Sequence, residues 1–230
     1  NDIIKSSWSG IVSRSRNSSQ IFEKIDNNIF VVGCPSIDAL NKAKEVNVKL
    51  LNNKFNFNFQ NKFACMLQHP VTSENKSSKI QIIQTLKALK LSKIPCFIIL
   101  PNNDSGYLEI IKEIKLSNYR WASSLSIEEY KSILKKCSFL IGNSSSGIHE
   151  AATYKKAVIN IGSRQNRRLK SFNVLNANYN HKEIKKKIDI CLKNSLFKEN
   201  LKKVKNLYGN GKSASKIINI IKKINLKINT

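Results

Sequence analysis

A run of three serines and a glycine lies where an apolar stretch ends and a helical pattern begins. Residues 138–142 read SFLIG, and NSSSG follows at 143–147, before a helix predicted over 147–155. Backbone N–H groups at a helix start and serine hydroxyls donate hydrogen bonds to anions, and a glycine lets a ligand approach the backbone closely. This combination favours a phosphate or diphosphate. Serines are equally good helix caps, and this loop alone leaves both roles open.

Charged residues follow the serine loop. Glu150 falls in the first turn of the predicted helix, where a carboxylate either stabilises the helix dipole or accepts hydrogen bonds from ribose hydroxyls. Arg164, Arg167 and Arg168 fall together in a later loop, although lysine supplies most of the 40 basic residues. Guanidinium groups suit phosphate oxygens, while a solvated loop is the simpler explanation. His149 is expected to be a surface histidine.

Two other loops carry polar residues directly after apolar runs. His69 follows the run at 63–68. A histidine in that place can contact phosphate or transfer a proton, although a single histidine more often has a structural role. Asn102 and Asp104 follow the run at 95–100, where they either contact a ligand or cap a turn.

The segments that carry these residues alternate between short apolar runs and helical patterns. Short apolar runs separated by helices are typical of a parallel sheet covered on both faces. We therefore predict an α/β fold, a Rossmann-like parallel sheet with helices on both faces, from residue 63 to about 205. The predicted strands are 63–68, 95–100, 119–123, 138–142, 157–162 and 173–175, and the predicted helices are 77–91, 106–116, 126–137 and 147–155.

This arrangement brings the polar loops to one edge. In open α/β sheets, ligands bind beyond the carboxyl ends of the strands, so the loops after the first, second, fourth and fifth predicted strands share that edge. Two other segments stand apart from the sheet. Residues 50–62, LLNNKFNFNFQNK, read as a polar-aromatic linker, and residues 213–224 predict an amphipathic helix after a glycine break.

Composition sets limits on the function class. The formal net charge is +25, but the lysines are spread over predicted helix faces, so solvated faces explain this charge better than a nucleic-acid-binding surface. No apolar run approaches the roughly 20 residues of a membrane span. Five cysteines without a CxxC pair indicate a reducing cytoplasm rather than a disulfide scaffold or a zinc site. We therefore expect a cytoplasmic location and neither a nucleic-acid nor a membrane partner.

Six stretches together resemble the hydrolysing UDP-N-acetylglucosamine 2-epimerases, the family that supplies N-acetylmannosamine for sialic-acid synthesis. The stretches occur in family order and with near-family spacing. They read VVGCPSIDAL, LQHPVTSE, LPNNDSG, FLIGNSSSGIHEAATYKKAVINIGSRQ, NVL and LYGNG. The resemblance implies the C-terminal, UDP-binding half of a glycosyltransferase-B-like (GT-B-like) fold. It also implies three parts: 1–60 as a remnant of the N-terminal domain and a crossover linker, 61–210 as the Rossmann-like UDP-binding domain, and 211–230 as a helix that packs back toward the N-terminal half.

The resemblance assigns roles at the diphosphate end of the ligand. His69 matches the family histidine that reaches the diphosphate and is needed for activity. Ser144 and Ser145 match the diphosphate-binding serines, and Arg164 matches a ligand-contacting arginine.

It assigns further roles in binding UDP to three other residues. Glu150 matches the ribose-binding glutamate, Asn102 a UDP-contacting residue, and Leu125 a position that holds uracil through its backbone. In the implied reaction, a carboxylate base removes the C2 proton of the sugar while UDP leaves, and water then adds to the 2-acetamidoglucal. Neither a cofactor nor a metal is implied. The partner is a UDP-sugar substrate, and the full-length protein is expected to form a homo-oligomer, a dimer or a tetramer.

The sequence also departs from the family pattern. The family's acid/base carboxylates lie in the N-terminal half and residues 1–28 match nothing, so we expect a chain that is N-terminally truncated and inactive alone. After SRQ the family usually has a small or apolar residue and then Gly-Arg-Glu, whereas residues 166–169 read NRRL.

Alternatives remain open. A non-hydrolysing UDP-N-acetylglucosamine 2-epimerase would carry a His-Arg-Arg-Glu-like motif in place of HPVTSE and Asp-Ser-Gly-Gly in place of NSSSG. A GT-B glycosyltransferase is a further enzyme alternative, and a basic nucleic-acid-binding module is the non-enzyme one. UDP-N-acetylglucosamine is the default substrate, with a 2,4-diacetamido analogue as the second possibility.

Overall fold

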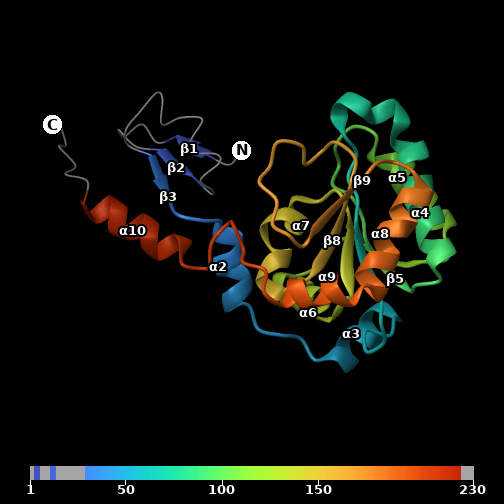
Figure 1. Ribbon diagram of the computed structural model, residues 1–230, viewed down its shortest axis with the longest axis horizontal. Helices are drawn as coiled ribbons and strands as arrows, with labels where there is room; N and C mark the ends of the chain where they lie inside the picture. Colours follow the sequence, from blue (N-terminus) through green and yellow to red (C-terminus); the bar gives the residue numbers. More distant parts are fainter. Residues whose placement is uncertain (1–2, 6–10, 14–28, 224–230) are drawn as a thin grey trace. The chain divides into compact units, whose positions relative to one another are not determined.

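The chain folds into two compact units, which are described separately. The computed structural model describes residues 3–5, 11–13 and 29–223 (Figure 1). One unit comprises residues 1–42 and 206–230, and the other comprises residues 43–205. Most of the segment 1–28, for which the sequence suggests a remnant of another domain, lies outside the described residues.

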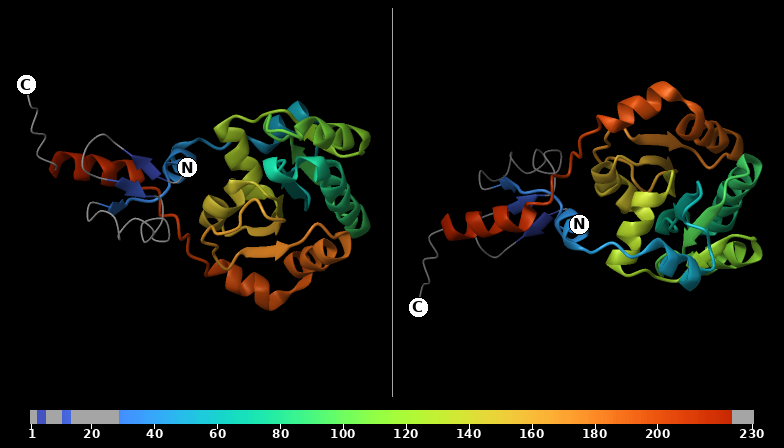
Figure 2. Two further views of the ribbon diagram at one scale, coloured as in Figure 1. Left: turned by 90° about the horizontal axis from the view of Figure 1, so that it is seen from above. Right: turned by 90° about the horizontal axis from the view of Figure 1, so that it is seen from below.

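The larger unit is built on a six-stranded sheet. Its strand order is β6-β5-β4-β7-β8-β9, and every neighbouring pair is parallel. The strands lie inside the unit, as the two views of Figure 2 show. They are β4 (Ala64–Leu67), β5 (Cys96–Ile99), β6 (Arg120–Ala122), β7 (Phe139–Gly142), β8 (Ala157–Ile161) and β9 (Val174–Ala177).

Helices cover both faces of this sheet because both faces are apolar. Successive side chains of a strand point to opposite faces, and in β4 Ala64 and Met66 join one buried cluster while Cys65 joins the other. On the first face lie α4 (Ser78–Ser92), α5 (Tyr107–Leu116), α8 (His181–Lys193) and α9 (Ser195–Lys202), and on the second lie α3 (Val48–Phe55) and α6 (Ile127–Lys136). The predicted fold class, a Rossmann-like α/β sheet with helices on both faces, is confirmed.

The chain reverses its direction of travel across the sheet between β4 and β7. From β4 it moves outward through β5 and β6, then returns to pair β7 with β4, with Ala64 opposite Phe139. Ligand sites in open α/β sheets lie at such a switch point. Gly142 ends β7 here with φ 128°, and a Cβ at this position would lie 2.0 Å from the carbonyl oxygen of Leu67. Glycine is therefore required where the two strands end.

The segment expected to be a linker, residues 50–62, instead holds most of helix α3 and anchors two buried side chains, Leu51 and Phe59, in the core, so that prediction is wrong. Asn47 caps α3 by accepting a hydrogen bond from the backbone of Lys49, and Asn56 ends the helix in the left-handed region. Aromatic rings then pack together, with centroids 4.8–6.2 Å apart. These rings belong to Phe55, Phe57, Phe59, Phe63 and Phe97.

The smaller unit joins distant parts of the sequence. Its strands β1 (Ile3–Lys5), β2 (Ile11–Ser13) and β3 (Ile29–Val31) form a sheet in which β1 pairs antiparallel and β3 parallel to β2. Helix α2 (Pro35–Lys42) contacts α10 (Ser213–Lys223). The carboxylate of Asp38 accepts hydrogen bonds from the backbone N–H groups of Ser213 (3.0 Å) and Ala214 (2.8 Å), and so caps α10.

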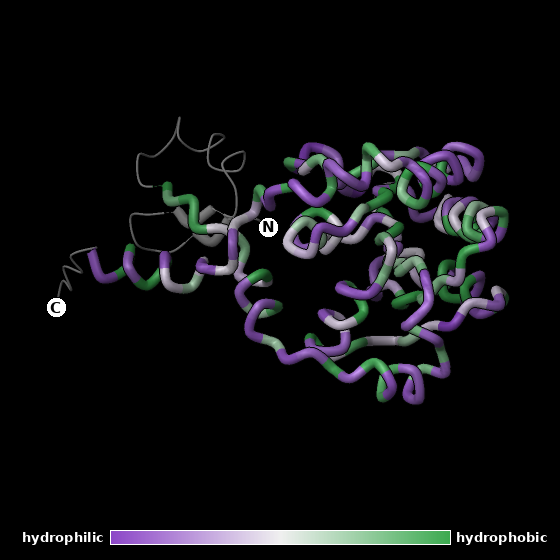
Figure 3. The backbone as a smooth tube through the Cα atoms, turned by 60° about the horizontal axis from the view of Figure 1, so that its bottom comes forward, coloured by the Kyte–Doolittle hydropathy of each residue, from purple (hydrophilic) through white to green (hydrophobic). Residues whose placement is uncertain are grey.

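Helix α10 alternates between hydrophilic and hydrophobic residues, as Figure 3 shows. Within the described ranges, no helix of the chain combines the length and apolar character needed to cross a bilayer.

Candidate functional site

The predicted site residues all lie at the carboxyl edge of the six-stranded sheet, in the segments that directly follow five strands, β4 to β8. His69 follows β4, Asn102 follows β5, and Leu125 follows β6. Ser144, Ser145 and Glu150 follow β7, and Arg164 follows β8.

Asn143 connects three of these loops, although the sequence did not single it out. Its side chain is buried and forms two hydrogen bonds with the backbone of His69. Oδ1 accepts from the His69 N–H (2.7 Å), and Nδ2 donates to the His69 carbonyl oxygen (2.8 Å). Its own carbonyl oxygen accepts from Gln165 Nε2 (2.8 Å) and from Arg164 Nη1 (3.4 Å). The loops after β4, β7 and β8 are therefore held together at the switch point.

A chain of polar contacts runs from His69 to Arg164. His69 Nδ1 lies 3.0 Å from Asn102 Oδ1 and 3.2 Å from the Asn102 backbone nitrogen. Asn102 Nδ2 donates to Asp104 Oδ2 (2.7 Å), and the same oxygen lies 3.8 Å from Arg164 Nη2. The structure thus brings His69, Asn102 and Arg164 together, as the sequence predicted for one edge.

This environment disfavours a charged imidazole in the absence of ligand. Burial, followed by the positive charge of Arg164, lowers the pKa of His69 below its usual value of 6.5, against opposing effects of Asn102 and Asp104. Burial also lowers the pKa of Arg164, while Asp104 opposes that shift. The Arg164 guanidinium still keeps its positive charge at neutral pH.

The helix after the serine loop is shorter than the predicted 147–155. Helix α7 spans Ser145–His149, and a separate 3₁₀ turn spans Ala151–Tyr154 because Glu150, with φ −112°, interrupts the helix. Ser144 is the N-cap, and its Oγ accepts from the backbone of Ser146 (3.3 Å). One short turn has a small dipole, so hydroxyls and backbone N–H groups are the main anion donors of this loop.

The arginines of the 163–168 loop separate. Arg164 belongs to the network just described, whereas Arg168 Nη1 lies 2.9 Å from His149 Nε2. His149 is only 4% exposed, so its prediction as a surface histidine is wrong. The loop that carries Arg168 folds back over α7 and buries the imidazole. Arg167 adopts the left-handed conformation, with φ 67°.

Glu74 is a second residue that sequence reasoning missed. Its carboxylate accepts from Gln81 Nε2 (2.7 Å) and from Ser163 Oγ, and so it joins the loop after β4 to the loop after β8. Glu74 and Ser163 line an open cavity of about 790 Å³ together with Asp104 and Arg164. Of the predicted site residues, Arg164 is the one that lines this cavity.

Leu125 lies farther along the edge, before the capping box that Ser126 and Glu129 form at the start of α6. Its side chain packs against the core cluster of the second face. No hydrogen bond joins Leu125 to the network around His69 in the described part of the chain.

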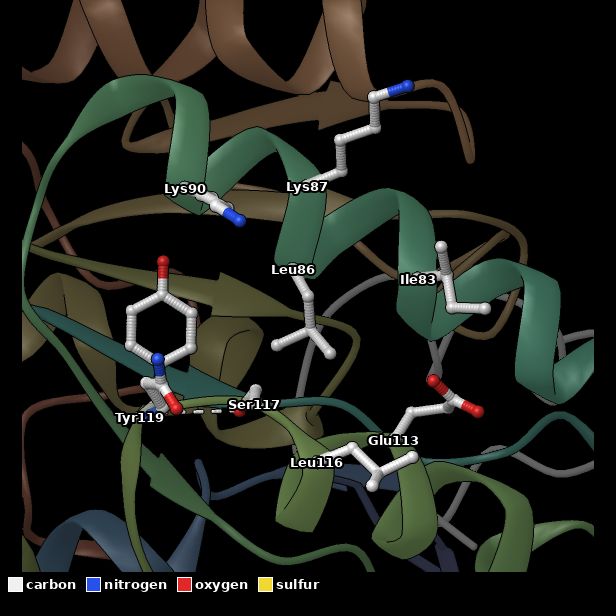
Figure 4. A pocket seen from close by; sticks show the side chains of 9 residues that line it. Ile83, Leu86, Lys87, Lys90, Glu113, Leu116, Ser117 and Tyr119 are labelled. Carbon is white, nitrogen blue, oxygen red and sulfur yellow. Dashed lines mark hydrogen bonds between the residues drawn. The ribbon is translucent and has the colours of Figure 1, made fainter.

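A further cavity, which Lys87 and Lys90 also line, lies away from the carboxyl edge. It measures about 480 Å³ and lies between α4 and α5, where Figure 4 shows Ile83, Leu86 and Leu116 among its lining residues. No residue of the carboxyl edge lines it. Across the residues that the structure describes, no group of three or more His, Cys, Asp or Glu side chains could hold a metal ion.

Comparisons with known proteins identify the family and the fold. The family model for UDP-N-acetylglucosamine 2-epimerases matches residues 7–222. A UDP-N,N′-diacetylbacillosamine 2-epimerase (hydrolyzing) of Legionella pneumophila is 32% identical over 205 residues, which make up 87% of this chain and 53% of that protein. A UDP-N-acetylglucosamine 2-epimerase of Neisseria meningitidis serogroup B is 29% identical over 160 residues, covering 68% of this chain and 42% of that protein.

A solved structure shares the fold. The UDP-GlcNAc 2-epimerase from Neisseria meningitidis bound to UDP-GlcNAc superposes with a TM-score of 0.77 at 16% identity, covering 93% of this chain and 61% of that one. The chain spans about half the length of the curated relatives it matches. On the family match and the identity over most of its length, the chain belongs to the UDP-N-acetylglucosamine 2-epimerase family.

Proposed function

We propose that the carboxyl edge of the larger unit binds the UDP part of a UDP-2-acetamido sugar, and that the protein of which this chain is part is a hydrolysing 2-epimerase. One observation carries this proposal. A single hydrogen-bonded network around Asn143 joins His69, Asn102 and Arg164 beside the serine loop. Family membership and the cavity of about 790 Å³ lined by Arg164 support it.

Each residue of the edge has a proposed role in this reaction. His69, Ser144, Ser145 and Arg164 stabilise the charge that develops on the departing diphosphate, because donors already in place need little reorganisation. A neutral His69 gains a proton as the negative diphosphate binds, and a charged donor makes the stronger hydrogen bond. Asn102 holds His69 in place.

The nucleoside end uses other residues. We infer that the carboxylate of Glu150 accepts hydrogen bonds from the ribose hydroxyls and that the backbone of Leu125 contacts uracil. The base that removes the C2 proton is a carboxylate from the other half of the family fold, so we expect this chain by itself to bind UDP without turnover. The proposed setting is sialic-acid or related nonulosonic-acid synthesis in the cytoplasm, by a homo-oligomeric enzyme.

A second sugar is favoured by a specific observation. The Legionella relative, 32% identical over 87% of this chain, acts by its name on UDP-N,N′-diacetylbacillosamine, a 2,4-diacetamido sugar nucleotide. The substrate is therefore either UDP-N-acetylglucosamine or its 2,4-diacetamido analogue. The two differ at C4 and at C6, parts of the sugar that the residues described at this edge do not assign.

Incubation with each sugar nucleotide, followed by chromatography, tests the proposal. The chain alone is expected to bind UDP and to release no sugar. The same incubation with a full-length protein that contains the chain should yield UDP and a free 2-acetamido sugar with the manno configuration. Accumulation of the epimerised UDP-sugar instead would identify a non-hydrolysing enzyme, and robust turnover by the chain alone would refute the placement of the base.

A further inference from the structure

The three serines of the loop have different hydrogen-bonding states. Ser144 Oγ accepts from the backbone N–H of Ser146 and caps α7. The hydroxyl of Ser145 makes no hydrogen bond within the described residues and stays available to a ligand. Ser146 Oγ, by contrast, donates to Glu150 Oε2 at 2.7 Å. The third serine is therefore engaged with the carboxylate and not with the diphosphate.

Tyr130 of α6 extends this contact into a chain of hydroxyls. Its phenolic oxygen is hydrogen-bonded to Ser146 Oγ. Since the single hydroxyl proton of Ser146 is used on Glu150, Tyr130 must donate and Ser146 must accept. Burial and then the negative charge of Glu150 raise the pKa of Tyr130 well above its usual value of 10.0, so the phenol keeps its proton. Both hydroxyls, of Tyr130 and of Ser146, donate toward the carboxylate, and hydrogen bonds arranged in such a chain strengthen one another.

The consequence for Glu150 is a fixed orientation. Oε2 is held by Ser146, while Oε1 takes no hydrogen bond from the described residues. A carboxylate held at one oxygen offers its other oxygen in one direction only. Without the hydroxyl chain, the side chain would sample several rotamers and would lose conformational freedom each time a ligand bound.

We propose that Tyr130 and Ser146 are positioning residues that hold the Glu150 carboxylate for the ribose hydroxyls. This inference rests on the proposed function, since it takes the ribose of UDP as the group that Glu150 recognises. It assigns to Tyr130, a residue of a different helix, a role in nucleotide recognition without contact to the nucleotide. A purely structural role would instead link α6 to α7 and affect all ligands equally.

The test measures ribose recognition separately from overall affinity. Isothermal titration of the chain with UDP and with 2′,3′-dideoxy-UDP gives a preference ratio. For hydrogen bonds to a charged group, the wild-type ratio should be about tenfold or more. E150Q should lower the ratio strongly, and Y130F and S146A should each lower it to about two- to threefold, because the carboxylate remains but is no longer held. In both, the affinity for 2′,3′-dideoxy-UDP should stay close to that of the wild type.

Two matched controls accompany these variants. S145A should weaken binding of both nucleotides while keeping the ratio, because the diphosphate is common to both. Y119F removes a phenolic hydroxyl from the cavity between α4 and α5, away from the carboxyl edge, and should leave both affinities unchanged.

The outcomes distinguish this inference from the proposal on which it rests. If the wild-type chain binds neither nucleotide, the proposed function fails and the ribose role fails with it. If E150Q loses the ratio while Y130F and S146A keep it, Glu150 recognises ribose unaided and the positioning role is refuted. Equal losses for both nucleotides in Y130F would show a structural role and would also refute it.

Discussion

Replacement of Asn143 by alanine should damage both stability and nucleotide binding. The side chain is 1% exposed and makes two hydrogen bonds with the backbone of His69, at 2.7 and 2.8 Å. Asn143→Ala leaves that N–H and that carbonyl oxygen without partners. Each unsatisfied buried group costs about 1–3 kcal/mol, and water that reaches the half-buried His69 lowers this cost, so we expect a loss of about 2–4 kcal/mol.

A urea titration of the chain measures this loss as a change in the free energy of unfolding. Asn103→Ala is the matched control, because Asn103 is exposed and makes no hydrogen bond with the described residues; its effect should stay within about 0.5 kcal/mol. The affinity for UDP should fall about tenfold or more in Asn143→Ala, since the loops after β4, β7 and β8 are no longer joined.

A second substitution at the same position tests the direction of the hydrogen bonds. Asn143→Asp keeps the acceptor for the His69 N–H but places a carboxylate oxygen against the His69 carbonyl oxygen. Burial raises the pKa of the introduced carboxyl, so the variant should be unstable at neutral pH and should recover as the pH falls and the acid gains a proton to donate. A loss below about 1 kcal/mol in Asn143→Ala with unchanged UDP affinity, or full stability of Asn143→Asp at neutral pH, would refute the reasoning.

Three further predictions concern other parts of the chain. Gly142→Ala should lower the free energy of unfolding by about 3 kcal/mol or more in thermal denaturation, because its Cβ would lie 2.0 Å from the Leu67 carbonyl oxygen at a strained φ of 128°. UDP affinity should rise as the pH falls from 8 through the lowered pKa of His69, because binding favours the protonated imidazole. Titration calorimetry measures this affinity, and His69→Gln should show a weaker dependence of the affinity on pH. Asp38→Ala should cost about 1–2 kcal/mol at pH 7 by urea titration. Burial raises the pKa of Asp38, but the hydrogen bonds from the α10 backbone have the larger combined effect, so the pKa in the folded protein is lowered. The stabilisation by Asp38 is therefore complete above pH 3.8, the usual pKa, and is lost as the pH falls through the lower pKa of the folded state.

The strands could be predicted because both faces of the sheet are buried. A strand such as β7, read from SFLIG, is a short apolar run of uniform character, and local sequence is enough to find it. The carboxyl edge followed from the same pattern. The segment after α3 could not be predicted in this way, because the alternating Phe and Asn of residues 55–59 resemble a linker until Phe57 and Phe59 are seen packed on Phe97.

The site shows the same limit. His69, Asn102 and Arg164 were predicted from their places after strands. The structure places His69 against Asn102 and links Arg164 to them through Asp104. Asn143 was missed because its hydrogen-bond partner, His69, is distant in the sequence. His149 was misjudged because its contact with Arg168, on the later loop that covers it, cannot be read from local sequence. A signal for Asn143 existed, since a polar residue directly after the last glycine of a buried strand has few local partners.

The pairing of β4 with β7 has a consequence for the order in which the larger unit folds. Ala64 pairs with Phe139, whereas the pairs β4 with β5 and β7 with β8 join segments closer in sequence, so the central contact closes the longest loop. Contacts of high sequence separation form slowly, and we expect the two halves of the sheet to associate late. Because His69 and Asn143 stand on opposite sides of this junction, an intermediate in which only one half has formed has no nucleotide site. UDP binding during refolding would therefore report the final association step and no earlier one.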